Sequence, residues 1–138
     1  MATTSTTDAY DRTVAEIEES LGMVPGFFGD LNQEDLVNEW PTFKRLTLEE
    51  TVVPAKYKEL INLAVASNLK CPYCINFHRG AAKLHGATDE ELAEVAFLAG
   101  ATPRWSSMIH AQEYDLGTFK REVGEMAAHL QSHMPTDD

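Results

Sequence analysis

Hydrophobic residues recur every three or four positions along most of this chain, the spacing that gathers side chains on one face of an α-helix. The first helix is predicted from four such residues: Tyr10, Val14, Ile17 and Leu21. Gly22 is expected to end it, because glycine is favoured just beyond the last turn of a helix. No stretch between turn signals alternates polar and apolar residues with the period of two that is typical of a β-strand. The pattern therefore predicts an all-α fold.

The segment from Val24 to Gly29 combines a turn with two aromatic residues. We expect a single helical turn there that plugs the hydrophobic core. Beyond it, Asn32 is placed to cap a helix. The apolar positions of that helix are Leu36, Val37, Trp40, Phe43 and Leu46. Pro41 should kink or restart the helix, because proline removes one backbone hydrogen bond and clashes with the preceding turn.

The centre of the chain predicts a hairpin of two helices. The first opens at Val53-Pro54, and residues 57–69 are apolar almost all round, which is typical of a helix buried on most faces. The second begins at Pro72, since proline is favoured in a first helical turn, and ends near Gly86. Because almost no loop separates the two helices, we expect them to pack against each other.

The last third of the chain is predicted to contain further helices. Thr88 and Glu91 form a capping box that opens a helix, and Gly100 is expected to close it. A further helical region is expected from Thr102-Pro103, interrupted at residues 114–117. The apolar positions of the last helix are Phe119, Val123, Met126, Ala127 and Leu130. We therefore predict one domain over residues 9–134, a bundle of about six to seven helices, after a disordered tail at residues 1–8.

Composition narrows the range of functions. The 138 residues include 11 basic and 22 acidic ones, a formal net charge of -11. So acidic a chain is not expected to bind nucleic acid or anionic membrane surfaces. The first residues lack the basic and apolar regions of a signal peptide, and the longest apolar run, residues 60–66, is too short to span a bilayer. The sequence predicts a cytoplasmic protein, where two close cysteines more often bind metal or carry out thiol chemistry than form structural disulfides.

The only two cysteines occur in Cys71-Pro72-Tyr73-Cys74, shortly before His78. Residues three and four apart are neighbours on a helix, so both thiols and the imidazole should share one stripe. We favour a catalytic dithiol, because a helix N-terminus lowers the pKa of a thiol and a pair at this spacing can close a disulfide. Two alternatives stay open. One is a zinc site with His85 or His110 as a further ligand, and the other is two buried cysteines without a role.

Eleven residues separate Glu59 from Cys71, and three separate Cys74 from His78. This spacing, with its surroundings over most of residues 20–130, resembles the alkylhydroperoxidase D-like, or carboxymuconolactone decarboxylase, family of all-helical proteins. The resemblance implies a cofactor-free thiol oxidoreductase, a peroxidase or disulfide reductase, in which Cys74 attacks, Cys71 resolves, and Glu59 with His78 relays protons. It also implies an electron-donor protein or small thiol as a partner, and a homo-oligomer, either a trimer or a hexamer. The alternative function is that of the family's decarboxylase branch, which lacks the cysteine pair.

Helix geometry supports part of this assignment independently. If the hairpin turns near residues 69–70, Glu59 lies about ten residues back and comes level with position 80 at ~1.5 Å per residue, hence near His78. The competing interpretation is a surface ion pair between Glu59 and Lys56, one turn earlier. The roles of the cysteines are less settled, because the helix N-terminus favours Cys71 as the thiolate whereas the family favours Cys74.

Several other residues carry weaker signals. Tyr73 stands where the best-studied branch of the family has a histidine, which favours dithiol–disulfide exchange over full peroxidase activity. Four aromatic residues are candidates for a substrate cavity, although their helical spacing is more typical of a core: Trp40, Phe43, Trp105 and Tyr114. His85 is placed to complement the dipole at a helix C-terminus.

Overall fold

The computed structural model describes residues 6–134, and within that range the chain forms seven α-helices, one π-helix and no strand. The predicted all-α fold is confirmed. The chain divides into two compact units, one up to Val95 and one from Ala96 onward, so the prediction of a single domain stays a prediction. The first helix, α1 (Thr6–Leu21), includes residues 6–8, which the sequence assigned to a disordered tail; Asp8 in its first turn complements the helix dipole. The rest of that tail lies outside the described residues.

The first unit begins with three helices around an N-terminal core, which consists of Ile17, Phe28, Leu36 and Trp40. These are α1, α2 (Gly26–Gly29) and α3 (Gln33–Phe43). The predicted cap is confirmed, because the Asn32 side chain accepts a hydrogen bond from the Asp35 backbone N–H at 2.9 Å. The predicted aromatic plug is half right. Phe28 is 4% exposed and joins the core, whereas its neighbour Phe27 is 60% exposed.

Pro41 lies inside α3, and the helix changes its geometry directly afterwards. Residues Lys44–Leu48 form the π-helix η1, in which each turn holds about one residue more than an α-helical turn. A proline withdraws one hydrogen bond from the backbone ladder, and a widened turn is one of the ways in which a helix accommodates such a break. The sequence predicted the disturbance at Pro41 but not its form.

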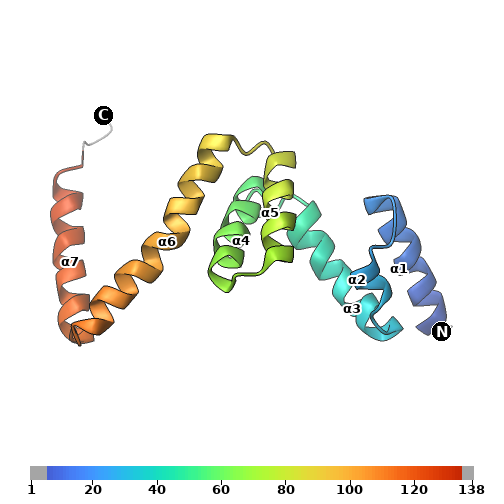
Figure 1. Cartoon of the computed structure of the whole chain (residues 1–138), viewed down its shortest axis with the longest axis horizontal. Helices are drawn as coiled ribbons and strands as arrows, with labels where there is room; N and C mark the ends of the chain where they lie inside the picture. The colour runs from blue at the N-terminus through green and yellow to red at the C-terminus, as the bar shows by residue number, and fades with distance from the viewer. Residues whose placement is uncertain (1–5, 135–138) are drawn as a thin grey trace. The chain divides into compact units, whose positions relative to one another are not determined.

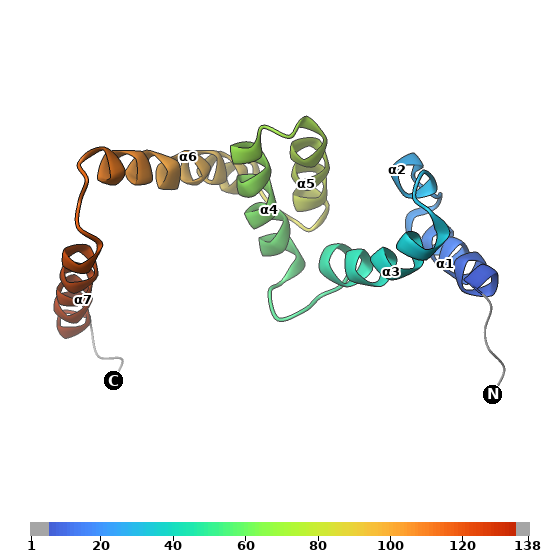
Figure 2. The same cartoon turned by 90° about the horizontal axis from the view of Figure 1, so that it is seen from below.

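The predicted hairpin is confirmed in α4 (Ala55–Leu69) and α5 (Pro72–Leu84), which lie side by side and antiparallel (Figures 1 and 2). Lys70 forms the turn between them in the left-handed conformation, with φ of 57°. The hairpin core consists of Leu60, Leu63, Ala82 and Leu92. Leu92 comes from the start of α6 (Asp89–Ala111), where the capping box predicted from Thr88 and Glu91 is formed in both directions.

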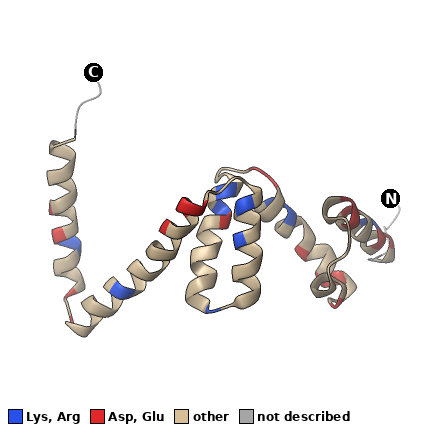
Figure 3. Ribbon diagram, turned by 45° about the horizontal axis from the view of Figure 1, so that its top comes forward, with Lys and Arg blue, Asp and Glu red and all other residues tan. Residues whose placement is uncertain are grey.

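Charge is unevenly distributed over the hairpin. Although the whole chain carries a net charge of -11, residues 55–86 contain five basic residues and one acidic residue, Glu59. Lys70 occupies the turn, and the other four basic residues lie toward the opposite end of the hairpin. Residues 60–69 and 71–78 contain no Asp, Glu, Lys or Arg, as Figure 3 shows by their tan colour. The cysteines therefore begin a helix in a part of the hairpin, residues 60–78, where Lys70 is the only Asp, Glu, Lys or Arg.

The second unit contains most of α6 and all of α7 (Leu116–Ser132). The predicted break between Gly100 and Pro103 is wrong, because α6 continues through both residues to Ala111. A proline removes a single hydrogen bond, and a long helix can retain its course through the turns on either side. Among the described residues of this unit, Ala99 alone is buried, at 9% exposure.

The apolar positions of α7 follow a heptad pattern, with alternating spacings of three and four. We call this row the α7 seam; its members, all exposed, are Leu116, Phe119, Val123, Met126 and Leu130. Such a row is typical of a helix that packs along another helix.

Among the described residues, none of the helices has the combination of length and apolar character needed to cross a membrane.

Candidate redox site

The two cysteines occupy the first turn of α5. Cys71 is the N-cap residue, and its Sγ accepts a hydrogen bond from the Cys74 backbone N–H at 3.3 Å. Pro72 follows at the first helical position, as expected from its fixed φ and missing N–H. The two Sγ atoms lie 2.7 Å apart, and both thiols are free. Because a disulfide S–S bond measures about 2.0 Å, only a small side-chain movement separates the reduced pair from a disulfide.

The pKa values of the two thiols are shifted in opposite directions. Hydrogen bonds from the Cys74 thiol and the Cys74 backbone N–H lower the pKa of Cys71, because both stabilise a negative charge on its sulfur. The same thiol–thiol hydrogen bond raises the pKa of Cys74, since this sulfur donates the proton. Of the two thiols, Cys71 therefore has the lowered pKa, which is the direction that a helix N-terminus favours.

The buried Glu59 pairs with the half-buried His78 between the two hairpin helices. His78 Nδ1 lies 2.6 Å from Glu59 Oε2, and Glu59 is 0% exposed. The other carboxylate oxygen, Oε1, has no hydrogen-bond partner among the described residues. A carboxylate that holds Nδ1 fixes the orientation of the imidazole and leaves Nε2 available for other contacts. The predicted proximity of Glu59 to His78 is confirmed.

The competing interpretation of Glu59 as a surface residue paired with Lys56 is wrong. Lys56 Nζ instead contacts Glu91 Oε1 at 2.8 Å, across to the start of α6. Glu59 lies at helical spacing from Lys56, but it is buried against His78 instead. Glu59 lies on the side of α4 that faces α5, whereas Lys56 reaches the solvent-exposed capping box.

Cys74 and His78 line an aromatic cleft of about 410 Å³. Its other lining residues are Phe27, Phe43, Thr47, Tyr73 and Phe77. The ring centroids of Phe43 and Phe77 are 6.1 Å apart, and Phe77 packs edge-on against His78 at 5.2 Å. Cys71 is not among the lining residues. The cleft therefore gives an apolar molecule access to Cys74, although Cys71 has the lowered pKa.

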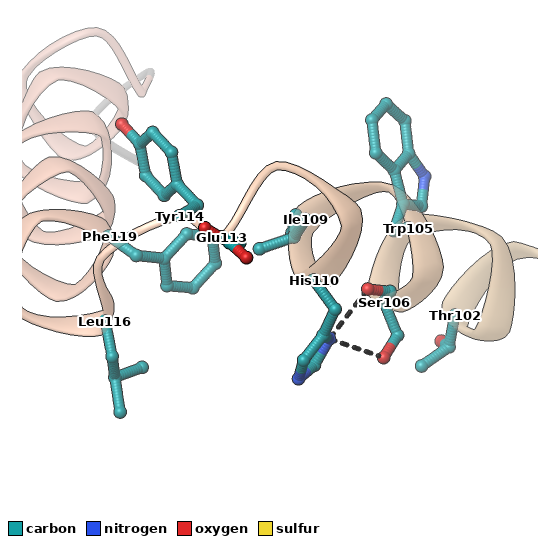
Figure 4. Close-up of a pocket in the computed structure, with 9 residues that line it drawn as sticks. All are labelled: Thr102, Trp105, Ser106, Ile109, His110, Glu113, Tyr114, Leu116 and Phe119. Carbon is teal, nitrogen blue, oxygen red and sulfur yellow. Dashed lines mark hydrogen bonds between the residues drawn. The ribbon is translucent and has the colours of Figure 1, made fainter.

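A larger cavity, of about 530 Å³, lies in the second unit between the end of α6 and the start of α7. Trp105 and Tyr114, two of the proposed cavity aromatics, line it, and Figure 4 shows His110 turned back onto its own helix. There His110 Nδ1 donates to the Ser106 backbone oxygen at 2.8 Å. Neither cysteine contributes to this cavity. Of the other two aromatic candidates, Phe43 lines the Cys74 cleft and Trp40 belongs to the N-terminal core.

The histidines considered as further zinc ligands occupy unremarkable positions. His85 is the C-cap residue of α5, where the sequence placed it, and His110 bonds within α6. Within residues 6–134, no group of three or more His, Cys, Asp and Glu side chains is arranged to hold a metal ion.

Three residues of the cleft were not predicted from the sequence: Phe27, Thr47 and Phe77. Phe77 directly precedes His78, so its place was accessible from helical spacing. Phe27 and Thr47 come from α2 and η1, far from the motif in sequence, and no local pattern connects them with the cysteines. One available signal was the adjacency of Phe27 and Phe28, because two consecutive residues of a helical turn cannot both face one core.

Comparison with known proteins identifies the family. The model of the carboxymuconolactone decarboxylase family matches residues 34–114, which is more than half of the chain. The chain is 33% identical over 97 residues to an alkyl hydroperoxide reductase of Mycobacterium tuberculosis, covering 69% of this chain and 27% of that protein. It is 29% identical over 69 residues to an uncharacterized protein of the cox locus of Paracoccus denitrificans, covering 50% of this chain and 62% of that protein. The chain thus spans less than two thirds of the length of these relatives.

The fold has a solved counterpart. The crystal structure of an alkylhydroperoxidase AhpD core from Rhodospirillum rubrum superimposes with a TM-score of 0.66 at 23% identity, covering 84% of this chain and 94% of that one. At this identity the likeness establishes the fold alone. Together with the family match, it shows that the chain belongs to the alkylhydroperoxidase D-like, or carboxymuconolactone decarboxylase, family.

Proposed function

We propose that this protein is a thiol oxidoreductase that cycles between a Cys71–Cys74 dithiol and the corresponding disulfide. One observation carries the proposal: two sulfurs 2.7 Å apart, one of them beside an imidazole that a buried carboxylate orients. The oxidant is a hydroperoxide or the disulfide of a partner, and a donor protein or small thiol restores the dithiol. Free thiols persist in a reducing compartment, which is the reason to include a cytoplasmic location in the proposal.

With a hydroperoxide, the reaction has two steps. The Cys74 sulfur attacks the terminal oxygen as its proton passes toward Cys71 or His78; the O–O bond breaks, an alcohol leaves, and Cys74 becomes a sulfenic acid. The Cys71 sulfur then attacks Cys74, the S–S bond forms and water leaves. Two thiols and one hydroperoxide thus give a disulfide, an alcohol and water. Protons for the leaving oxygens come from the Glu59–His78 pair, which is placed to act as a relay.

The assignment of Cys74 as the attacking thiol follows from access rather than from acidity. Cys74 lines the cleft and Cys71 does not, whereas the pKa of Cys71 is the lowered one. These two observations are compatible if the Cys71 thiolate receives the Cys74 proton, because the two sulfurs are already in hydrogen-bonding contact.

Mass spectrometry of the thiols tests the proposal. Reduced protein treated with cumene hydroperoxide should lose both free thiols together and recover them with a dithiol reductant. In Cys71→Ser, a sulfenic acid should accumulate on Cys74, because the resolving thiol is missing. In Cys74→Ser, turnover should stop. Adduct formation on Cys71 in Cys74→Ser would reverse the two roles, and thiols that resist both peroxides and disulfides would refute the redox function.

Elemental analysis separates the redox proposal from the zinc alternative. A structural zinc ion contributes directly to folding, so its removal by a chelator would lower the thermal stability visibly. We expect purified protein to contain no stoichiometric zinc and to unfold at the same temperature with and without chelator. About one zinc per chain would instead favour the metal site.

We further propose that the protein is a homo-oligomer. The α7 seam supports this, because its five apolar side chains are exposed in a unit whose described residues bury only Ala99. A heptad row of this kind is stabilised by a partner helix, and a second copy of the chain supplies one at equal concentration. Light scattering at micromolar concentration should therefore give a multiple of the chain mass, with three or six copies as the expected number.

A further inference from the structure

Thr47 is a polar residue of the Cys74 cleft to which the redox scheme gives no role. It is half-buried and lines the cleft with Cys74 and His78. Among the described residues, its hydroxyl has no hydrogen-bond partner. A threonine on a helix commonly bonds back to a carbonyl one turn earlier, as Thr13 does to Ala9 at 2.9 Å. The Thr47 hydroxyl is therefore available to a molecule in the cleft.

The π-helix explains how Thr47 reaches this position. Residues Lys44–Leu48 form the widened turn, and Thr47 is its fourth residue. An extra residue in the turn rotates the side chains that follow relative to an α-helical continuation of α3. Such single π-turns occur frequently at functional sites, because they redirect one side chain without ending the helix.

Lys58 secures this segment to the hairpin. Its Nζ donates to the Glu49 backbone oxygen at 2.6 Å, to the Arg45 backbone oxygen at 3.3 Å and to Thr51 Oγ1 at 3.2 Å. These contacts bracket Thr47 on both sides. Glu59, the next residue of α4, orients His78. Two consecutive residues of one helix thus contact two parts of the cleft lining, Lys58 through η1 and Glu59 through the imidazole.

We propose that Thr47 is a substrate-binding residue that donates a hydrogen bond to the hydroperoxide in the Cys74 cleft, and that Lys58 is a positioning residue acting through it. The inference rests on the proposed function. When sulfur takes the terminal oxygen and the O–O bond breaks, negative charge develops on the leaving oxygen, and a fixed hydroxyl stabilises it. Three of the other six lining residues are phenylalanines, which offer no donor, and Tyr73 is 85% exposed.

Thr47→Val tests the inference, because valine has nearly the shape of threonine and lacks the hydroxyl. The second-order rate of dithiol oxidation by cumene hydroperoxide should fall about 10- to 100-fold, the effect of one hydrogen bond to a developing charge. Thr47→Ser should restore most of the rate. Thr42→Val, at an exposed position of α3, is the matched control and should react like the natural protein.

A second reagent separates substrate binding from a structural effect. Iodoacetamide also reacts with the cysteines, but its reaction involves no peroxide oxygen that a hydroxyl could stabilise. The rate of alkylation should therefore be the same in Thr47→Val and the natural protein. If both rates fall together, Thr47 only maintains the cleft, and the inference is wrong. The inference is also wrong if Thr47→Val oxidises within about twofold of the natural protein.

Lys58→Met completes a double-mutant cycle. If Lys58 acts through Thr47, the Lys58→Met protein should be slow with the hydroperoxide, and adding Thr47→Val should slow it little further. Independent, multiplicative losses would overturn the positioning role of Lys58. Failure of the natural protein to form a disulfide with any peroxide would overturn the role of Thr47, whereas failure with peroxides and disulfides alike would overturn the proposed function.

Discussion

The two units of the chain have similar hydrophobic patterns but use them differently. In the first unit, the apolar faces of α1, α3, α4 and α5 meet within the chain and enclose the N-terminal core and the hairpin core. In the second, the α7 seam is just as regular and remains exposed. Hydrophobic periodicity therefore identifies the apolar face of a helix, but it does not show whether that face packs within the same chain or against another.

The difference also separates two kinds of cavity. The Cys74 cleft is assembled from α2, α3, η1 and α5 and contains a thiol, an oriented imidazole and a hydroxyl. The cavity of the second unit is formed by two consecutive helices, and its histidine, His110, is hydrogen-bonded to the backbone of its own helix. Volume alone favours the second cavity, whereas the chemistry is in the first. The proposed reaction thus needs only the first unit, and the proposed assembly needs the second.

A charge in the α7 seam should produce the largest effect. Val123→Glu places a carboxylate where a partner helix would pack, and a buried unpaired charge costs several kcal/mol in each copy, about enough to dissociate the oligomer. Light scattering should then give the mass of one chain. Ala128→Glu, on the opposite face of α7, should leave the mass unchanged. A monomeric natural protein, or equal dissociation by both variants, would contradict the role of the seam.

Removal of the proton relay should have the next largest effect. We expect His78→Ala and Glu59→Gln to slow dithiol oxidation by cumene hydroperoxide about 10²–10⁴-fold, the usual contribution of general acid–base catalysis. Circular dichroism should show that both variants remain folded. His110→Ala, which removes the histidine of the other cavity, is the control and should oxidise at the natural rate. A comparable loss of oxidation rate in His110→Ala would contradict the assignment of the chemistry to the Cys74 cleft.

Core truncations should distinguish the two units by their dependence on protein concentration. Leu63→Ala removes a buried side chain of the hairpin core and should lower the free energy of unfolding by about 2–5 kcal/mol at every concentration. Leu130→Ala lies in the exposed seam, so its cost should grow with the oligomerised fraction. Urea unfolding at two protein concentrations measures both effects. A large loss for Leu130→Ala that does not vary with concentration would place that side chain in a core of the single chain.

The smallest effect concerns the acidity of Cys71. Its pKa is lowered chiefly by the hydrogen bond from the Cys74 thiol and next by the Cys74 backbone N–H. In Cys74→Ala the first contribution is lost and the second remains, so the pKa of Cys71 should rise part of the way to its ordinary value. Alkylation of Cys71 by iodoacetamide follows the thiolate, and its midpoint should therefore move to higher pH. An unchanged or lower midpoint would show that another group stabilises the thiolate.

The sequence predicted those features that depend on neighbouring residues. Asn32 caps α3, Pro72 opens α5, and Thr88 with Glu91 form the capping box, because each involves groups within one helical turn. Glu59 was matched to His78 by counting residues along two helices joined by a short turn. The structure confirms these positions, whereas the catalytic roles of Glu59, Cys71, Cys74 and His78 stay predictions.

What the sequence did not predict depends on packing between distant segments. Gly100 and Pro103 are poor helix residues, yet α6 passes through them, since local propensity costs only about 1–3 kcal/mol and neighbouring turns can offset it. The π-turn after Pro41 and the Lys58 contacts that flank Thr47 were not predicted, because no periodicity encodes them. The cleft needed α2 beside α5, a contact between segments more than forty residues apart.

Cys71 has one further consequence as the residue that caps α5. Its sulfur accepts a backbone N–H of the first turn, and this contact is one of those that lower the pKa of the Cys71 thiol and so favour a thiolate in the reduced pair. A dithiol favoured in this way has a raised reduction potential, because oxidation must give up the stabilised thiolate and weaken the cap; for this two-electron couple, each tenfold change in the equilibrium corresponds to about 30 mV. The disulfide should then be readily reopened by an external thiol. Under the proposed function, the cap therefore favours the dithiol over the disulfide.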